Sequence, residues 1–422
     1  MVRSIWLAMI FIFATAAAQA VEPCTPAPSA SPEKGSPAVV AAEAAIESKL
    51  ADEQAGPIHT LLVNKEFPLT GIKWGGQLFI DLPLNNEPED AQITLRRAQL
   101  AVWRTFGCDW SFKLTALYNS GRLNLSDNYL VYSGWRTAIA QLGVFDPPFS
   151  LESLSSSGGL TFMERSLAVY ALSENKSGGV ALLKRTPSSI LSAGLFVVSP
   201  EQDKKTQSGQ ALVMRYVHSP ISFLRSTGVH LGSSFSYRFN ASSNLTEFKS
   251  RPEIATTDDF FVDTGDITGL DKVFRFGLEA ASVMGRFSWQ AELLSARAER
   301  TGYQSVIFNG AYVYASWFLT QDSRNYNAGT GLFSPVEPTE PLFRGGKGAF
   351  ELAARASIVD LTDKDVIGGE ESNVSLGFNW YLNSQFRVMS NVIKVLSMDR
   401  PGSVYDDATP WIVALRLQWQ IQ

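Results

Sequence analysis

The chain has 422 residues, a formal net charge of −5, 18% charged residues and 11% aromatic residues. A mean hydropathy of −0.01 excludes a bundle of membrane-spanning helices, and no run of 18 consecutive apolar residues occurs. The only histidines are His59, His218 and His230, and none has a metal-ligand spacing to another histidine or to a cysteine pair. We therefore expect no metal, no cofactor, no catalytic residue and no enzyme. The enzymatic alternative is a hydrolase that uses His230 with Ser234.

The first twenty residues have the pattern of a secretory signal peptide. Arg3 precedes an apolar run from Ile5 to Phe13, and small residues flank Gln19 at the end of the segment. This run is too short for a spanning helix, so the pattern predicts a signal peptide over residues 1–20 and export of the mature chain.

Residues 21–70 differ in composition from everything after them. They begin rich in Pro, Ser and Ala and become rich in Ala and Glu around residues 39–54. This composition predicts a periplasmic N-terminal arm that is partly helical. A short oligomerising coil is the alternative, because Val39, Val40, Ile46 and Leu50 cover barely two heptads.

From residue 71 to residue 422, segments of about ten residues alternate between apolar and polar. In 372–382, for example, Val374, Leu376 and Phe378 alternate with Ser375 and Gly377. Sixteen such segments occur: 76–84, 92–105, 108–119, 122–133, 136–145, 177–186, 189–198, 209–218, 227–239, 272–283, 285–297, 307–319, 347–359, 372–382, 385–396 and 410–421. The pattern predicts an all-β fold, a transmembrane antiparallel β-barrel of about 16 strands with its apolar face on lipid. A soluble β-sandwich is the alternative.

Three connections are too long for simple turns, and they cover residues 146–176, 240–271 and 320–346. With both termini in the periplasm, the first two fall on the extracellular side and the third on the periplasmic side. Because a sixteen-stranded barrel has a wide lumen, we expect long loops to fold inward and narrow it.

Several segments of the barrel region resemble one family. They are "GVFDPPFSLESLSSSGGLTFMERSLAVYAL" (143–172), "RPEIATTDDFFVDTGDI" (251–267), "ASWFLT" (315–320), and "GAFELAARASIVDL" with "SLGFNWYLN" (348–382). They are similar to the phosphate- and polyphosphate-selective porins of the Gram-negative outer membrane. The resemblance implies a trimeric outer-membrane channel that passes anions such as phosphate. The expected partners are outer-membrane lipid, small inorganic anions and two further copies of the chain, with no nucleic acid.

Strand phase predicts which charged side chains face the lumen. The acidic ones are Asp81, Glu279, Glu292 and Glu351, and the basic ones, twice as many, are the expected anion-binding residues of the pore: Arg97, Lys113, Arg215, Arg238, Arg275, Arg355, Arg387 and Arg416. Arginine suits this task because its guanidinium group stays charged and offers five donors to an oxyanion. The alternative is that the arginines pair with the carboxylates and only brace the wall.

The expected constriction loop has the opposite balance. Residues 146–175 hold Asp146, Glu152, Glu164 and Glu174 but only one base, Arg165. The family commonly has a lysine before "PPF", where this chain has Asp146. A general or cation-leaning porin therefore stays open, as does a role of Glu152 and Glu164 as anchors for Arg165 or a wall arginine. A receptor or adhesin is a third class, which the short polar loops at 199–208, 298–306 and 398–409 disfavour.

The two cysteines generate the first testable prediction. Cys24 lies in the arm and Cys108 in a turn on the same, periplasmic side, an oxidising compartment, so the first hypothesis is a disulfide that holds the arm at the barrel rim. Two free thiols are the alternative. Alkylation of the unreduced protein under denaturing conditions, read by mass spectrometry, should label neither cysteine. Two labelled cysteines would contradict the prediction.

Overall fold

The computed structural model describes residues 72–85, 92–119, 122–197, 209–219, 227–241 and 246–421. The predicted signal peptide at 1–20, the arm at 21–70 and Cys24 of the predicted disulfide lie outside these ranges. Within them, no helix has the length and apolar character needed to cross a membrane.

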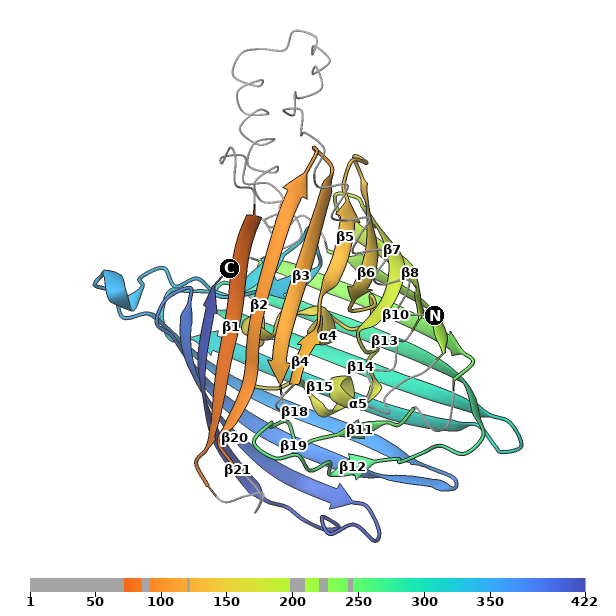
Figure 1. Cartoon of the computed structure of the whole chain (residues 1–422). Helices are drawn as coiled ribbons and strands as arrows, with labels where there is room; N and C mark the ends of the chain where they lie inside the picture. Colours follow the sequence, from red (N-terminus) through yellow and green to blue (C-terminus); the bar gives the residue numbers. More distant parts are fainter. Residues whose placement is uncertain are drawn as a thin grey trace.

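Seventeen strands of the described residues form one sheet that closes on itself (Figure 1). All neighbours pair antiparallel, and β1 seals the ring against β21. The strands are β1 (Ile72–Pro83), β2 (Thr94–Phe106), β3 (Trp110–Asn119), β4 (Arg122–Leu125), β5 (Asn128–Tyr132), β6 (Ala138–Phe145), β7 (Ser177–Arg185), β8 (Ser189–Val197), β9 (Gln210–His218), β10 (Thr227–Phe239), β13 (Leu270–Met284), β14 (Phe287–Arg300), β15 (Val306–Phe318), β18 (Ala349–Asp363), β19 (Val366–Tyr381), β20 (Phe386–Asp399) and β21 (Trp411–Ile421).

The closed ring has sixteen strand positions, which we call staves, because β4 and β5 are two halves of one interrupted strand. Both pair with β3, and Ser126 and Asp127 interrupt the stave between them. The predicted antiparallel barrel of about 16 strands is confirmed. Since the number of staves is even, β1 begins and β21 ends at the same end of the barrel, which we call the terminal end; the opposite end is the far end.

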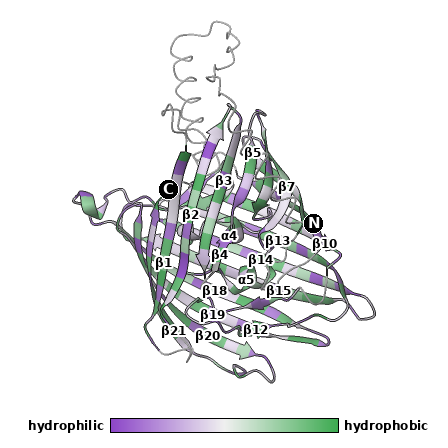
Figure 2. Cartoon of the chain, viewed as in Figure 1, coloured by the Kyte–Doolittle hydropathy of each residue, from purple (hydrophilic) through white to green (hydrophobic). Residues whose placement is uncertain are grey.

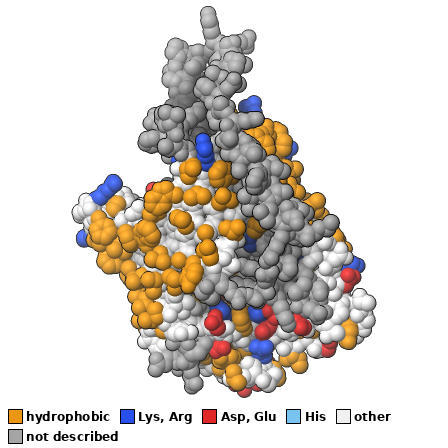
Figure 3. Space-filling model, in the orientation of Figure 1, with side chains coloured by type: hydrophobic (Ala, Val, Ile, Leu, Met, Phe, Trp, Pro, Cys, Tyr) orange, Lys and Arg blue, Asp and Glu red, His pale blue; other side chains and the backbone are white. Residues whose placement is uncertain are grey.

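Hydrophobic and hydrophilic residues alternate along many of the strands (Figure 2). The outer face is apolar and the inner face polar, the reverse of a soluble sheet. On β19, Leu376 and Phe378 are exposed on the outside, whereas Ser375 and Asn379 are completely buried on the inside. Figure 3 shows hydrophobic side chains over the visible outer wall and charged side chains at the lower rim, which is the far end. Such a wall buries its apolar face in lipid, where every backbone group must find a partner within the sheet.

One predicted boundary is wrong. Residues 360–371 were expected to be a connection, but β18 and β19 continue through them to a tight turn at Lys364 and Asp365. In this part Asp360 faces outward, and Val359 and Leu361 are fully buried on the inside. Because the apolar residues point inward here, the alternation that marks a lipid-facing strand ends several residues before β18 itself ends.

The 146–176 loop and the loop before β13 fold into the ring, as predicted, whereas the connection from β15 to β18 does so only in part: Thr330 and Leu332–Pro335 line the lumen, and Phe343 is 67% exposed in a segment that projects from the barrel (Figure 1). The 146–176 loop contains α4 (Leu151–Leu154), η1 (Ser157–Gly159) and α5 (Leu167–Leu172), which lie inside the barrel in Figure 1. The loop before β13 forms the hairpin of β11 (Lys249–Ser250) and β12 (Val262–Asp263). The connection from β15 to β18, which we call the terminal-end loop, forms β16 (Asn325–Asn327), β17 (Leu332–Ser334) and η4 (Leu342–Arg344) at the terminal end.

Helix α5 packs directly on the inner wall. A Cβ at Gly310 of β15 would lie only 2.8 Å from the Cβ of Ala168, so a glycine is needed where the helix meets the strand. Leu167, Ala168 and Leu172 are fully buried in an apolar cluster with strand residues such as Phe308. The lumen therefore contains a packed core beside the space that stays open.

Candidate functional site

The structure places the eight predicted basic side chains on the inner face of the wall, but in two different environments. Six of them are at most 4% exposed and meet the inward loops: Arg215, Arg238, Arg275, Arg355, Arg387 and Arg416. Arg97 and Lys113 instead border open space. Anion binding by these eight side chains stays a prediction, and their contacts show what else each one does.

Glu164 of the 146–176 loop is held by two arginines, Arg96 of β2 and Arg416 of β21, from the strands on either side of β1. Its carboxylate accepts hydrogen bonds from Arg96 Nε and NH2 at 2.7 and 2.8 Å, and from Arg416 NH2 at 2.6 Å. Arg416 also makes a bidentate pair with Asp81 at 2.6 Å and donates to the Met163 carbonyl. This group fixes the middle of the loop against β1, β2 and β21.

Glu174 fixes the end of the same loop in the same manner. It is completely buried between Arg238 and Arg275, pairs with both, and accepts a hydrogen bond from Ser236. The Glu174–Arg275 distance is 2.8 Å, and the Arg275 guanidinium lies 5.3 Å from the centre of the Phe248 ring. Phe248 belongs to the loop that contains β11 and β12, so this loop and the 146–176 loop meet at this part of the wall.

Glu253 anchors that second loop. Its carboxylate pairs with Arg355 of β18 at 2.8 Å and accepts hydrogen bonds from Ser357 and Ser375 at 2.6 and 2.8 Å. It also accepts from the backbone N–H of Leu167 at the start of α5. One buried carboxylate thus connects two loops and two strands. We call the groups around Glu164, Glu174 and Glu253 the three latches.

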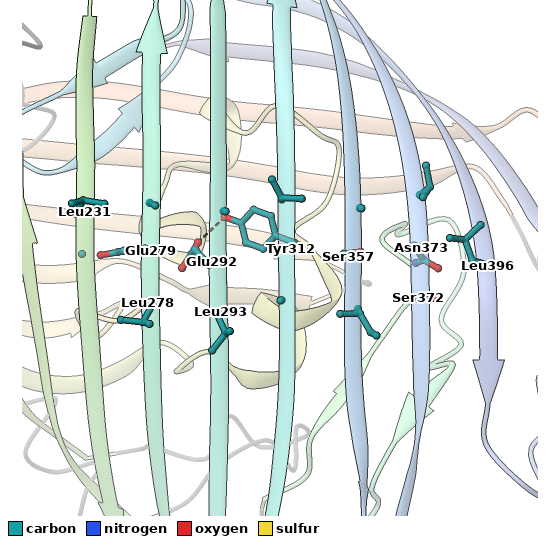
Figure 4. Close-up of a pocket in the computed structure, with 18 residues that line it drawn as sticks. Leu231, Leu278, Glu279, Glu292, Leu293, Tyr312, Ser357, Ser372, Asn373 and Leu396 are labelled. Carbon is teal, nitrogen blue, oxygen red and sulfur yellow. Dashed lines mark hydrogen bonds between the residues drawn. The ribbon is translucent and has the colours of Figure 1, made fainter.

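Two further carboxylates of the wall, Glu292 and Glu279, also have hydrogen-bond partners inside the barrel. Glu292 accepts from the backbone N–H groups of Leu151 and Glu152 at 3.0 and 2.7 Å, and from Tyr312 at 2.7 Å (Figure 4). Glu279 pairs with Arg215 at 2.7 Å. The sequence-based alternative of bracing therefore applies to many of these groups.

Figure 4 also shows the outward side of this wall. Leu278 and Leu293 alternate with Glu279 and Glu292 along β13 and β14, and about half of each leucine surface is exposed. Outward leucines and small residues line an apolar hollow of about 820 Å³ on the outer face. That face is separated from the lumen by the sheet.

Two arginines bind loop carbonyl groups rather than carboxylates. Arg387 donates to the carbonyls of Leu160 and Thr161 at 2.7 and 3.1 Å, and Arg324 of the terminal-end loop donates to the Gly159 carbonyl. The terminal-end loop is further held where Arg215 donates to the Gly331 carbonyl at 3.1 Å. The 146–176 loop and the terminal-end loop therefore touch inside the barrel.

Within the described residues, a cavity of about 560 Å³ lies along one side of the lumen, and we call it the side passage. Its wall is the inner face of β1, β2, β3, β5 and β6. Its other side is formed by Leu154–Ser157 and Arg165 of the 146–176 loop, and by Thr330 and Leu332–Pro335 of the terminal-end loop.

Six charged side chains border the side passage: Arg97, Lys113, Arg165, Lys176, Asp127 and Asp146. The lysines share the two acids, with Lys113–Asp127 at 3.5 Å, Lys176–Asp146 at 3.1 Å and a further Lys176–Asp127 pair. Four bases against two acids leave the passage positive. This balance differs from the acidic count of the loop sequence because Glu152, Glu164 and Glu174 are buried in contacts with the wall.

Arg97 and Arg165 have no carboxylate partner among the described residues. Arg97 donates to the side-chain oxygen of Gln99 at 2.8 Å. Arg165 donates only to backbone carbonyls, those of Glu152, Ser153 and Ser155, at 2.9 to 3.1 Å. Their positive charges are therefore exposed to whatever enters the passage.

Sequence reasoning missed Arg96, although it is a member of the Glu164 latch. Strict alternation assigns only one of two adjacent residues to the lumen, and Arg97 was chosen. A β-bulge breaks the alternation, because Phe79 pairs with Arg97 and Ile80 pairs with Leu95. Both arginines therefore turn inward, as bulges allow. The adjacent pair of arginines was the available signal.

A closed barrel with a polar interior and inward-folded loops defines a porin-type channel. The family model described as "Phosphate-selective porin O and P" matches residues 72–421. The chain belongs to this family and forms an outer-membrane porin channel rather than an enzyme. The predicted resemblance is thereby confirmed.

Two relatives support the assignment. Porin O of Pseudomonas aeruginosa is 26% identical over 391 residues, which cover 80% of this chain and 85% of that protein. An uncharacterized protein of Caulobacter vibrioides is 28% identical over 290 residues, 66% of this chain. The match spans 57% of the length of the Caulobacter protein.

Solved porin structures share the fold. A trimer form of OmpT from Vibrio cholerae has a TM-score of 0.52 at 15% identity, and covers 83% of this chain and 99% of its own. An anion-selective porin of Comamonas acidovorans has a TM-score of 0.52 at 11% identity, with the same shares covered. At these identities the likeness concerns the barrel alone.

The latches generate a stability prediction. Replacing Glu164 with Gln removes the carboxylate partner of Arg96 and leaves Arg416 with Asp81 alone. Removing one partner of a buried pair costs up to about 3–5 kcal/mol. The temperature at which the folded band disappears on unboiled gels should fall, and single-channel current should become noisier as the loop loosens. Asp146→Asn is the control, because the carboxylate of Asp146 is 40% exposed and its pair with Lys176 should contribute less than about 1 kcal/mol. Equal shifts for both variants would contradict the latch.

The same latches give the loop a pH dependence. Burial alone would raise the pKa of Glu174, but the charges of Arg238 and Arg275 lower it to about 2; Arg96 and Arg416 likewise hold the pKa of Glu164 well below its usual range. Such groups stabilise the fold fully above the ordinary carboxyl pKa of about 4.5, and this contribution is lost as pH falls toward the folded-state value. In Glu164→Gln the acid-induced loosening should therefore be smaller.

Proposed function

We propose that this porin conducts small anions, including phosphate-type anions, through the side passage. The observation that carries the proposal is that Arg97 and Arg165 face the cavity and have no carboxylate partner in the described part of the chain, while Glu152, Glu164 and Glu174 of the loop are paired with wall arginines. Each guanidinium can replace part of an anion's hydration shell, and weak successive contacts allow release. The family description and the anion-selective Comamonas porin support the same ion class.

A weakly selective or cation-leaning porin is the second candidate. Asp127 and Asp146 border the passage and favour it. Both acids, however, pair with lysines in the same cavity, so their negative charge is offset locally.

The ion class is tested by the reversal potential of the purified channel in a potassium chloride gradient. We expect current carried mainly by chloride. Replacing Arg97 and Arg165 with Gln should reduce the anion-to-cation permeability ratio by about fivefold or more, because one unit charge at about 4 Å contributes roughly 1 kcal/mol in water. Arg297→Gln is the matched control, because that side chain is on the outer face and 54% exposed. Current carried by potassium in the unaltered channel would favour the second candidate.

We further propose that the chain is a homotrimer in the outer membrane and is delivered there by its signal peptide. Small residues at 136–144 and 349–357 favour close packing between barrels, and these stretches belong to β6 and β18, on opposite sides of the ring. We place the contact at β4–β6. β6 has only eight residues, fewer than the roughly 9–11 needed to cross a bilayer, and Ser126 and Asp127 interrupt the strand position that β4 and β5 share, so a neighbouring barrel suits this wall better than lipid.

The oligomer is tested by light scattering in mild detergent, where the mass of three chains is expected. Leu125 of β4 is 71% exposed, and Leu125→Arg should reduce the mass to that of one chain while the barrel stays folded on unboiled gels. Leu231→Arg, on the outer face of β10, should leave three chains together. A single-chain mass for the unaltered protein would overturn the trimer and leave the barrel unaffected.

A further inference from the structure

The side passage contains polar groups that an inorganic anion does not require. Gln77 and Gln99 lie opposite one another on β1 and β2 and border the cavity together. Gln99 uses its amide oxygen to hold Arg97, whereas no described residue hydrogen-bonds the side chain of Gln77. Ser156 and Ser157 border the cavity from the loop side, and no hydrogen bond of their hydroxyl groups occurs within the described residues.

The spacing of these groups follows from the strand. The Gln77–Gln99 pair lies two residues from the Phe79–Arg97 pair, which is about 7 Å toward the terminal end at the usual rise of a strand. That distance matches roughly the length of one hexose. A molecule that placed an anionic group on Arg97 and Arg165 would therefore place its body beside the free amide and hydroxyl groups.

An aromatic surface lies further along the same wall. Trp103 borders the passage four residues beyond Gln99, and its ring extends over Gly75 of the neighbouring strand. A Cβ at residue 75 would lie 2.9 Å from the ring carbon Cη2, so only glycine leaves space for the indole in this position. The cavity volume of about 560 Å³ is typical of sites that enclose small organic molecules between aromatic and polar groups.

From this arrangement we propose that the side passage binds and conducts anions with a polyhydroxylated body, namely sugar acids or sugar phosphates. The inference rests on the proposed anion channel. Arg97 and Arg165 bind the carboxylate or phosphate, Gln77, Ser156 and Ser157 exchange hydrogen bonds with the hydroxyl groups, and Trp103 covers an apolar face of the sugar. Gln99 acts as a positioning residue for Arg97. Binding must stay weak at each point so that the solute passes on.

The test measures how strongly each probe molecule blocks the chloride current through the purified full-length channel in planar bilayers, whatever its oligomeric state. The probes are gluconate and glucose 6-phosphate, compared with acetate, inorganic phosphate and uncharged glucose. We expect gluconate to block at lower concentration than acetate, and glucose 6-phosphate at lower concentration than inorganic phosphate. Preference for one of the two sugar anions identifies the anionic group and supports the inference.

The variant Gln77→Met with Ser156→Ala keeps both arginines and removes hydroxyl-binding groups. The ratio of block by gluconate to block by acetate should fall about tenfold, the loss expected for two hydrogen bonds. Gln304→Met, in an exposed loop at the far end, should leave the ratio unchanged. If acetate and inorganic phosphate block as well as their sugar counterparts, or the double variant leaves the ratios unchanged, the inference is overturned while the anion channel stands. A potassium-selective reversal potential would instead overturn the proposed function.

Discussion

Buried pairs between wall arginines and loop carboxylates determine what the lumen of this porin can be. A charged group in this interior is stable only with a partner, because burial removes its water. Glu164, Glu174 and Glu253 each bring a loop to an arginine on the wall, so the loops lie inside the barrel. The shape of the open passage is the space that these pairs leave.

The same pairing separates structural charges from functional ones. Residues that are alike in sequence, such as Arg97 and Arg275, have different surroundings: one faces the cavity beside an amide, and the other is enclosed with Glu174. A count of charged residues over the loop or over the wall therefore does not predict whether the side passage is positive or negative. What an entering ion meets is the small set without buried partners, chiefly Arg97 and Arg165.

The barrel and the loops also depend on each other physically. Lipid requires the outer wall to be apolar and every strand to be paired, which forces polar side chains inward. Inward polar groups need hydrogen-bond partners, and the loops provide them. The wall residue Glu292, for example, accepts hydrogen bonds from two backbone N–H groups of α4. The lumen is therefore both the solvent-facing side of a membrane protein and the core that orders its loops.

The amino-acid sequence by itself determined the barrel, because alternation with period two in sixteen segments admits few other folds and lipid demands it over the whole wall. It also predicted that long loops fold inward and that the eight basic residues face inward, but it missed Arg96 on β2 and Glu371 on β19, whose side chain is fully buried on the inner face. Only the tertiary structure decided which charges stay available. The partners of Arg355, at Glu253, and of Arg416, at Asp81, lie far away in the sequence, and the bulge that turns Arg96 inward arises from pairing with β1. Local patterns report the face of a strand; the partner across the lumen depends on how the closed ring and its loops meet.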